Sequence, residues 1–335
     1  RLERPSTGAC ALCQVRLTGP HVPQPGDAMR RHTTLSSIID QDRGASVAMG
    51  NFDGVHLGHQ AVIDLARAHG PLGIVTFEPH PRSHFLPDTP AFRLMSPEAK
   101  ASRMEKLGVE QLYEVGFDSR LAGLSAPEFA EQVLVDALGI SHVVVGADFQ
   151  FGKGRQGNAD TLRDLGAQLA FGVTIAELEH AQGQEISSSA IRAALTDGAP
   201  ERASAMLGHY HRIEGMVEQG DQRGRDLGFP TANLSLAGLH PPKFGVYATL
   251  VDVLTWPHAG RYQGAASIGV RPTFGHTIPN LEVFLLDFSG DLYGQTLSVA
   301  LVAFQRPELK YEGIEPLIAQ MHKDVEETRR RLATL

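Results

Sequence analysis

Apolar residues along 34–205 fall into short runs typical of buried strands, and these runs alternate with longer stretches that have helical spacing. Strands are expected at 45–49, 72–77, 112–116, 141–145 and 173–178, and helices at 58–68, 97–107, 126–138, 159–170, 188–195 and 200–207. Ser96 before Pro97, and Ser125 three residues before Glu128, are helix-start signals that support two of these boundaries. This alternation predicts an α/β domain with a doubly wound parallel sheet covered by helices on both faces.

From about His209 the pattern changes to strands separated by turns rich in Gly, Pro and Asp. The expected strands are 212–218, 231–236, 246–253, 262–269, 281–288 and 296–304. A last helix at 314–332 carries its apolar residues on one face. Six strands followed by a packing helix predict a small antiparallel β-barrel, because closure removes exposed sheet edges.

The chain therefore divides into an N-terminal extension at 1–30, an α/β domain at 34–205 and a β-barrel domain at 209–333. The extension is rich in Pro and Gly up to Ala28 and has no apolar periodicity, so we expect it to be disordered. Met29 is a more natural start than Arg1.

The composition is ordinary for a globular protein, with 335 residues, 42% hydrophobic and 20% charged. A net charge of -8 argues against a general nucleic-acid binder, which needs a basic face to neutralise phosphates. No apolar run approaches the roughly 20 residues that span a bilayer. We therefore expect a cytoplasmic protein without nucleic-acid or membrane partners, as a monomer or weak homo-oligomer that acts on small molecules.

The turn from Gly50 to His59 joins the first expected strand to a helix. In an open α/β sheet such a turn lies at the carboxyl ends of the strands, where ligands bind. Its glycines allow close approach of backbone to a ligand, and a helix N-terminus offers free N–H groups to phosphate. His56 and His59 are three residues apart, so both share one face of the first helical turn and suit stabilising phosphate charge.

Three further loops follow expected strands. The turn 76–81 is held by two prolines and would place His80 in the same crevice as His56. The loop 146–157 combines an aromatic pair, glycines and two cations, which suits a flavin ring and a phosphate or is simply a flexible surface loop. The segment 186–192 brings two hydroxyls, helix N–H groups and Arg192 together, an arrangement able to neutralise a triphosphate.

In the barrel, the glycine-punctuated stretch 220–233 can wrap phosphates with its N–H groups. Thr231 and Asn233 alternate onto one side of the next strand, and their oxygens are hard ligands suited to Mg²⁺. Glu282 is a single carboxylate on an apolar strand. It is either buried because it has a functional role or turned outward into solvent, and the residues alone leave both possibilities open.

Several of these motifs together resemble a known family. The turn 50–59 is similar to the H-x-G-H signature of the nucleotidylyltransferase superfamily, in the form found in the adenylyltransferase half of bacterial bifunctional riboflavin kinase/FMN adenylyltransferases. The T-F-E-P-H-P turn, the G-x-D-F-x-F-G loop and the I-S-S-x-x-I-R helix start resemble the same family and occur in its order. Ser189 stands where the family usually has Thr, and Ala190 where Arg is frequent.

The second half resembles the riboflavin kinase signature through G-x-x-x-G-R-x-L-G-F-P-T-A-N, and matching segments follow at 245–247, 268–274, 281–288 and 292–294. Both resemblances together cover about residues 34–330. They imply a Rossmann-like nucleotidylyltransferase domain and a riboflavin kinase barrel. The open alternatives are an adenylyltransferase for another small phosphate substrate with a non-catalytic barrel, and a flavin-binding module without turnover.

The resemblance implies an ATP-dependent enzyme of flavin cofactor biosynthesis that phosphorylates riboflavin to FMN and then adenylylates FMN to FAD and pyrophosphate, with Mg²⁺ as cofactor. The catalytic residues it implies are His56, His59, Arg192 and the general base Glu282. The ATP-binding residues are Gly50, Asn51, Phe52, Asp53, Gly54, Gly58, Ser188, Ser189, Gly220, Gly224, Arg225 and Gly228. The flavin-binding residues are His80, Asp148, Phe149 and Arg155, and the metal ligands are Thr231 and Asn233.

Overall fold

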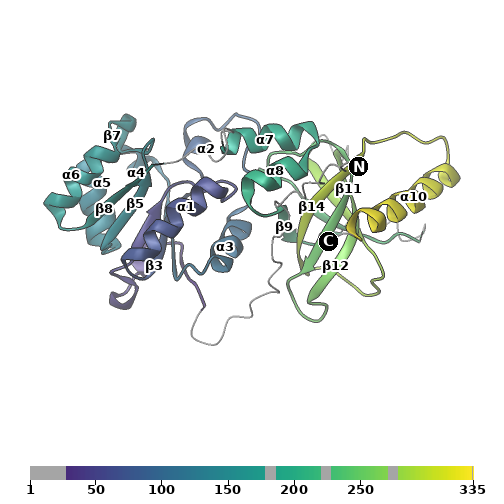
Figure 1. Cartoon of the computed structure of the whole chain (residues 1–335), viewed down its shortest axis with the longest axis horizontal. Coiled ribbons are helices and arrows are strands. Elements are labelled where there is room, and N and C mark those ends of the chain that lie inside the picture. The colour runs from purple at the N-terminus through teal and green to yellow at the C-terminus, as the bar shows by residue number, and fades with distance from the viewer. Residues whose placement is uncertain (1–27, 178–185, 220–227, 271–277, 334) are drawn as a thin grey trace, which may run out of the picture.

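The computed structural model describes residues 28–177, 186–219, 228–270, 278–333 and 335. The expectation of disorder for the N-terminal extension falls almost wholly outside these residues. The molecule is elongated, with an α/β domain at one end and a β-rich domain at the other, and two short helices lie between them (Figure 1).

The α/β domain is built on one parallel sheet with the strand order β1-β4-β3-β2-β5-β8. Its strands are β1 (Arg30–His32), β2 (Ser46–Met49), β3 (Leu72–Glu78), β4 (Gln111–Gly116), β5 (His142–Gly146) and β8 (Gly172–Ala176). From β2 the chain moves to β3 on one side, and it returns later to β5 on the other. The turn after β2 therefore lies at the switch point of the sheet, where a crevice forms.

Helices cover both faces of this sheet, as the sequence predicts. On one face α1 (Leu57–Ala66) and α3 (Pro97–Lys106) pack over residues such as Ala48 and Ile74. The other face is covered by α5 (Ala126–Phe129), the π-helix η4 (Ala130–Ala137) and α6 (Ala159–Leu169). The helix expected at 126–138 is thus present, and the predicted capping box joins Ser125 and Glu128.

Some short elements were not predicted. They are β1 at the sheet edge, α2 (Pro81–Phe85), α4 (Ser119–Gly123), the hairpin of β6 (Gln150–Phe151) and β7 (Gly157–Asn158), and the 3₁₀ turns η1 (Leu35–Ser37), η2 (Asp40–Asp42), η3 (Arg67–His69) and η5 (Lys153–Arg155). Each is at most five residues long, so a hydrophobic period has too few positions in which to show itself.

Helices α7 (Ser188–Asp197) and α8 (Pro200–Leu207) join the two domains. Their buried faces form one apolar cluster with Leu94, which comes from the segment before α3. Backbone hydrogen bonds extend the junction into the second domain: Lys243 N–H donates to Leu195 (2.9 Å) and His240 N–H to Arg93 (2.8 Å).

The second domain is a six-stranded antiparallel sheet with the order β10-β13-β12-β11-β14-β9. Its strands are β9 (His211–Met216), β10 (Thr231–Ser235), β11 (Gly245–Val253), β12 (Gly260–Val270), β13 (Pro279–Leu285) and β14 (Thr296–Arg306). The sheet curls until its edges meet, where Glu218 N–H donates to Asn233 C=O (2.9 Å). Helix α10 (Ile314–Leu332) packs against β11 and β12, so the predicted barrel with a terminal helix is confirmed.

We predict that Leu94→Ala destabilises the fold by about 2–5 kcal/mol, because Leu94 is 1% exposed and fills the cluster that holds α7 and α8. Leu86→Ala is the matched control. Leu86 is 52% exposed, so its truncation should change stability by no more than about 0.5 kcal/mol. Denaturant unfolding of both variants measures the difference, and equal losses would contradict the role given to Leu94.

Candidate active sites

The turn after β2 is tightly constrained. Phe52 and Val55 both have positive φ (50° and 46°), which is costly for residues with side chains and is typical of functional turns. Between them Gly54 has φ +88°, and a Cβ there would lie 2.8 Å from Leu94 Cδ1. Both the positive φ and the lack of space for a Cβ therefore require glycine at position 54, and they restrict the backbone conformation of the turn that leads into α1.

His56 and His59 lie at the start of α1, as the sequence predicts. His56 is the N-cap, and its Nδ1 accepts the N–H of His59 (3.3 Å). The two rings stack with centroids 3.6 Å apart. Burial lowers the pKa of His56 to about 4, and burial with the nearby His56 lowers the pKa of His59 well below its ordinary value. Both rings are neutral at pH 7, and their N–H groups are available as hydrogen-bond donors.

Asp53 connects this turn to two other segments. It is 6% exposed, and its Oδ1 accepts the backbone N–H of Leu94 (2.7 Å). Its Oδ2 lies 3.7 Å from Arg192 Nη2 of α7, and burial raises the pKa of the carboxyl. Ser188 Oγ donates to the backbone C=O of Asp53 (2.8 Å). The structure therefore brings Ser188 and Arg192 to the histidine turn.

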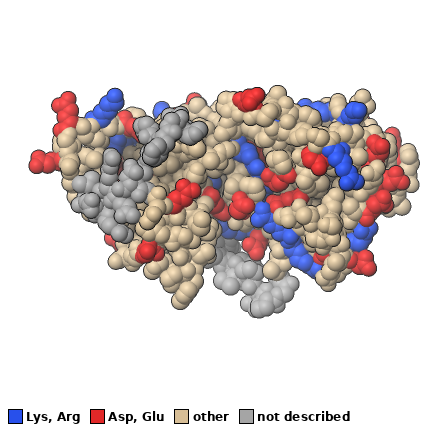
Figure 2. All heavy atoms as spheres, turned by 180° about the vertical axis from the view of Figure 1, so that it is seen from behind, with Lys and Arg blue, Asp and Glu red and all other residues tan. Residues whose placement is uncertain are grey.

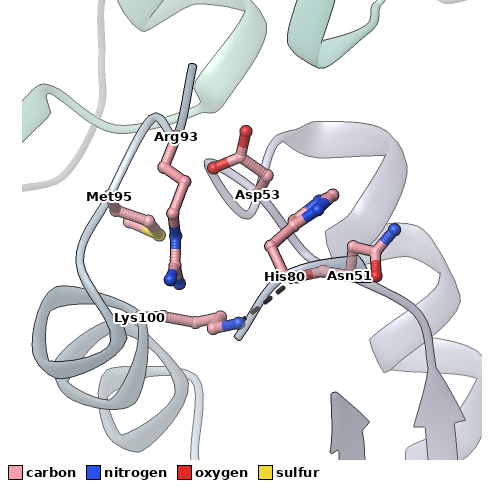
Figure 3. A pocket seen from close by; sticks show the side chains of 6 residues that line it. All are labelled: Asn51, Asp53, His80, Arg93, Met95 and Lys100. Carbon is pink, nitrogen blue, oxygen red and sulfur yellow. Dashed lines mark hydrogen bonds between the residues drawn. The ribbon is translucent and has the colours of Figure 1, made fainter. Parts of the chain in front are cut away.

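A small cavity adjoins this turn, lined by Asn51, Asp53, His80, Arg93, Met95 and Lys100 (Figure 3). His80, the N-cap of α2, thus shares a crevice with the turn after β2, and burial lowers its pKa to about 4. Neither Arg93 nor Lys100 belongs to one of the motifs found in the sequence. Lys100 is 2% exposed and stands on the buried face of α3 with Met104 at helical spacing, which was the signal available.

Glu78, at the end of β3, accepts hydrogen bonds from both of these cations. Arg93 binds it with two nitrogens (2.6 and 2.8 Å), and Lys100 Nζ lies 2.8 Å from Oε1. Burial acts to raise the pKa of Glu78, but these partners outweigh it and the pKa is lowered. With Arg192 the site holds three cations against two carboxylates, Glu78 and Asp53. This excess suits a polyanionic ligand.

The other predicted site residues of the first domain lie at the start of α7 and around the β6–β7 hairpin. Ser187 is the N-cap of α7, and Ser189 is exposed in its first turn. Phe149 packs partly buried against Phe151 of the β6–β7 hairpin. Asp148 is exposed in the turn before β6, and Arg155 is exposed in the loop of the hairpin. Neither they nor Phe149 line the cavity beside His80.

The candidate residues of the barrel share one face of its sheet. Asn233 on β10 is directly opposite Glu282 on β13, and Thr231 is opposite Phe284. Residues opposite each other on antiparallel strands point to the same side. Leu281 and Val283 point into the core, so half-buried Glu282 lies on the outer face, where Asn233 is 9% exposed. Gly228 precedes β10, whereas Gly220, Gly224 and Arg225 lie outside the described residues.

A doubly wound sheet with paired histidines at its switch point, followed by an antiparallel barrel, defines a nucleotidylyltransferase-type domain joined to a kinase-type barrel. Family models agree with this division: FAD synthetase matches residues 38–190 and riboflavin kinase matches 207–332. The chain belongs to the family of bacterial bifunctional riboflavin kinase/FMN adenylyltransferases. It phosphorylates riboflavin to FMN and adenylylates FMN to FAD, so the alternative of a non-catalytic barrel is set aside.

Similar proteins cover nearly the whole chain. The bifunctional riboflavin kinase/FMN adenylyltransferase of Listeria monocytogenes is 41% identical over 312 residues, which is 91% of this chain and 98% of the relative. That of Pseudomonas fluorescens is 39% identical over 303 residues, 88% and 95% of the two chains. A solved structure titled Macrolide-efflux Protein from Streptococcus pneumoniae aligns with a TM-score of 0.75 at 30% identity, covering 90% and 99%. Within the described residues, no helix has both the length and the apolar character to cross a bilayer.

We predict that the free energy of unfolding falls as the pH is lowered from 6.5 towards 4. His56, His209 and His211 have folded pKa values of about 4, 4 and 3, below the ordinary 6.5, so the unfolded chain binds more protons in this window. Each should cost about 2 kcal/mol of stability at pH 5.

Denaturant unfolding at pH 7.5 and pH 5, at one ionic strength, measures this loss. In His211→Gln the difference between the two pH values should shrink, because that side chain no longer titrates. If the loss of stability between pH 7.5 and pH 5 is the same in this variant as in the wild type, His211 is protonated equally well in the folded protein, which would contradict the prediction.

Proposed function

We propose that the two reactions use separate sites, one at the histidine turn and one on the outer face of the barrel. The main support for the first site is the contact of α7 with the turn. Ser188 is hydrogen-bonded to the backbone of Asp53, and Arg192 lies close to the Asp53 carboxylate. This contact supports a single pocket in which a triphosphate spans from the histidine pair to the N-terminus of α7.

At the first site the FMN phosphate attacks the α-phosphorus of ATP, and pyrophosphate leaves. The chain supplies no nucleophile. Instead His56 and His59 donate hydrogen bonds to the phosphate oxygens on which charge develops. Arg192 and the serines at 188–189 hold the β- and γ-phosphates. The stack of two neutral rings supports this role. Hydrogen bonds from neutral N–H groups become stronger as negative charge develops on the phosphate oxygens, and no proton has to be transferred.

Lys100 and Arg93 contribute to the same site in our proposal. Both are fixed on Glu78 and Lys100 also donates to Thr76 Oγ1 (3.0 Å), so their positions are set before a nucleotide arrives. Positioned charge of this kind needs little rearrangement in the transition state. His80 and Asp148 are proposed at the border of the flavin phosphate and the nucleoside, with Phe149 and Arg155 towards the flavin.

At the second site Glu282 accepts the proton of the ribityl 5′-hydroxyl, whose oxygen attacks the γ-phosphorus of ATP. Its half-buried place between Asn233 and Ser267 of the neighbouring strands supports a role as general base. The stretch 220–228 is proposed to wrap the phosphates. Phosphoryl transfer depends mainly on such positioning and on charge neutralisation.

Thr231 and Asn233 would hold Mg²⁺ at this second site. A hydroxyl and an amide oxygen on one face are the hard donors that Mg²⁺ takes when nucleotide phosphates supply further ligands. The contact made by Asn233 Oδ1 is long, 3.4 Å from Asn280 Nδ2, and leaves this oxygen able to coordinate. Bound there, the ion would neutralise charge on the β- and γ-phosphates. The ATP demand of both steps supports a cytoplasmic location.

We predict that His59→Ala lowers FAD formation from FMN by about a hundredfold or more, because one donor to the transition state is lost, and leaves FMN formation intact. Glu282→Ala should abolish FMN formation and still convert supplied FMN to FAD. Chromatography of flavin products measures both reactions. Loss of both activities in either variant would argue against separate sites.

We also predict that Thr231→Val raises the Mg²⁺ concentration needed for half-maximal riboflavin phosphorylation, because it exchanges an oxygen ligand for a methyl group of similar size. Thr231→Ser keeps the hydroxyl and is the matched control, which should stay near the wild type. A titration of Mg²⁺ at saturating ATP measures this, and equal behaviour of the two variants would remove Thr231 from the metal site.

A further inference from the structure

A second cavity lies between the two domains, where α3 faces β9 (Figure 1). Its empty volume is about 340 Å³ including the part open to solvent. It is lined by Met95, Ala99, Arg103 and Lys106 from the first domain and by His209, Arg212 and Glu214 from the second. Charged side chains of both signs crowd this middle region on the face shown in Figure 2.

The sequence spacing explains why these side chains meet. Ala99, Arg103 and Lys106 are four and three residues apart, so they occupy one face of α3. Arg212 and Glu214 are two apart on β9 and point to the same side of the strand. The domain junction therefore sets three cations against one carboxylate around this cavity.

On the barrel side of the cavity, Arg212 is already ion-paired and Glu214 is hydrogen-bonded. Arg212 Nη1 lies 2.9 Å from Asp252 Oδ2 and also donates to Ser298 Oγ (2.9 Å). Asp252 in turn binds Arg261 (2.7 Å), and Glu214 accepts the hydroxyl of Ser298 (2.8 Å). Asp252 is thus ion-paired within its own domain, whereas Glu214 has only this hydroxyl as a partner.

The cations on the α3 side of the cavity have no such partners. Within the described part of the chain, neither Arg103 nor Lys106 forms an ion pair, and the buried Nε of Arg103 has no hydrogen-bond partner. Burial, and then the charge of Arg212, lower the pKa of both groups, although Glu214 and Asp252 act in the opposite sense on Lys106. Arg103 is half-buried with a buried nitrogen that has no partner, which is costly, whereas Lys106 is exposed. The unpaired charge of Arg103, with Lys106 one turn further along α3, favours an anionic ligand.

We propose that this cavity binds a phosphate-type oxyanion, held by Arg103 and Lys106 from one domain and by Arg212 from the other. Guanidinium groups suit the several oxygens of such an anion, and Lys106 adds a point charge. Two sources share this chemistry: free inorganic phosphate, and the pyrophosphate that the adenylyl step releases. Either one would join the domains across the gap between α3 and β9.

The cavity also borders the adenylylation site. Met95 lines both cavities, and His209 Nε2 lies 3.1 Å from the C=O of Gly54 in the histidine turn. His209 Nδ1 lies 2.9 Å from the C=O of Tyr210, so a neutral ring, with one N–H, serves only one of the two carbonyls. An anion in this cavity would therefore lie beside the contact between His209 and the histidine turn.

The test compares the full-length protein with Arg103→Gln and Lys106→Gln, which remove charge at this cavity alone. Arg163→Gln is the matched control, because Arg163 is an exposed cation on α6 that pairs only with Asp160 among the described residues. Sodium phosphate and sodium pyrophosphate are titrated separately by calorimetry, with thermal unfolding in parallel and sodium chloride at equal ionic strength as the reference.

We expect the wild type and Arg163→Gln to bind and to gain thermal stability, and each cavity variant to bind about tenfold or more weakly, as for the loss of one charge-assisted hydrogen bond. Without phosphate, Arg103→Gln should be at least as stable as the wild type, since an unpaired charge is gone. Tighter binding of pyrophosphate than of phosphate would identify the product as the source, and the reverse would identify free phosphate.

Three outcomes would overturn the proposal. The first is no binding by the wild type. The second is binding by Arg103→Gln and Lys106→Gln as tight as that of the wild type, which would place the anion in the nucleotide sites. The third is a loss of stability in Arg103→Gln without phosphate, which would show that Arg103 is satisfied by the protein itself.

Discussion

The buried carboxylate of Asp53 is the constraint on which the first site depends. It fixes the backbone at Leu94 through one oxygen and faces Arg192 with the other, while its own C=O receives Ser188. Two segments far from the turn in sequence, that of Leu94 and helix α7, are thereby held against it. Because Gly54 and its neighbours with positive φ allow that turn a single course, the position of His56 follows from these contacts.

The two halves of the chain solve the same problem, the handling of nucleotide phosphate, with different means. In the proposed first site, the α/β domain offers a helix N-terminus, neutral imidazoles and a group of cations fixed on Glu78. The barrel offers oxygen-bearing side chains on the outer face of its sheet, where Thr231 and Asn233 stand beside Glu282. Two separate sites, as proposed, would require FMN made at the second to be released and bound again before it is adenylylated.

Local signals in the sequence predicted most of the framework. The helix 314–332 was predicted to the residue, and the caps at Ser96 and Ser125 act as expected, because periodicity and capping depend on near neighbours. Arg93 and Lys100 were missed because their role comes from Glu78, a contact made only when β3 and α3 pack. The edge strand β1 was missed for a similar reason, since three residues become a strand only by pairing with β4.

The seam of the barrel has a consequence for its chemistry. Asn233 closes the cylinder with its backbone C=O, which accepts the N–H of Glu218, and the same residue carries the amide proposed to coordinate an ion. One residue therefore contributes both to barrel closure and to the proposed metal site. If the barrel opened at this position, the side-chain amide would move with the backbone, so the rigidity of the closure determines how firmly the ion is held.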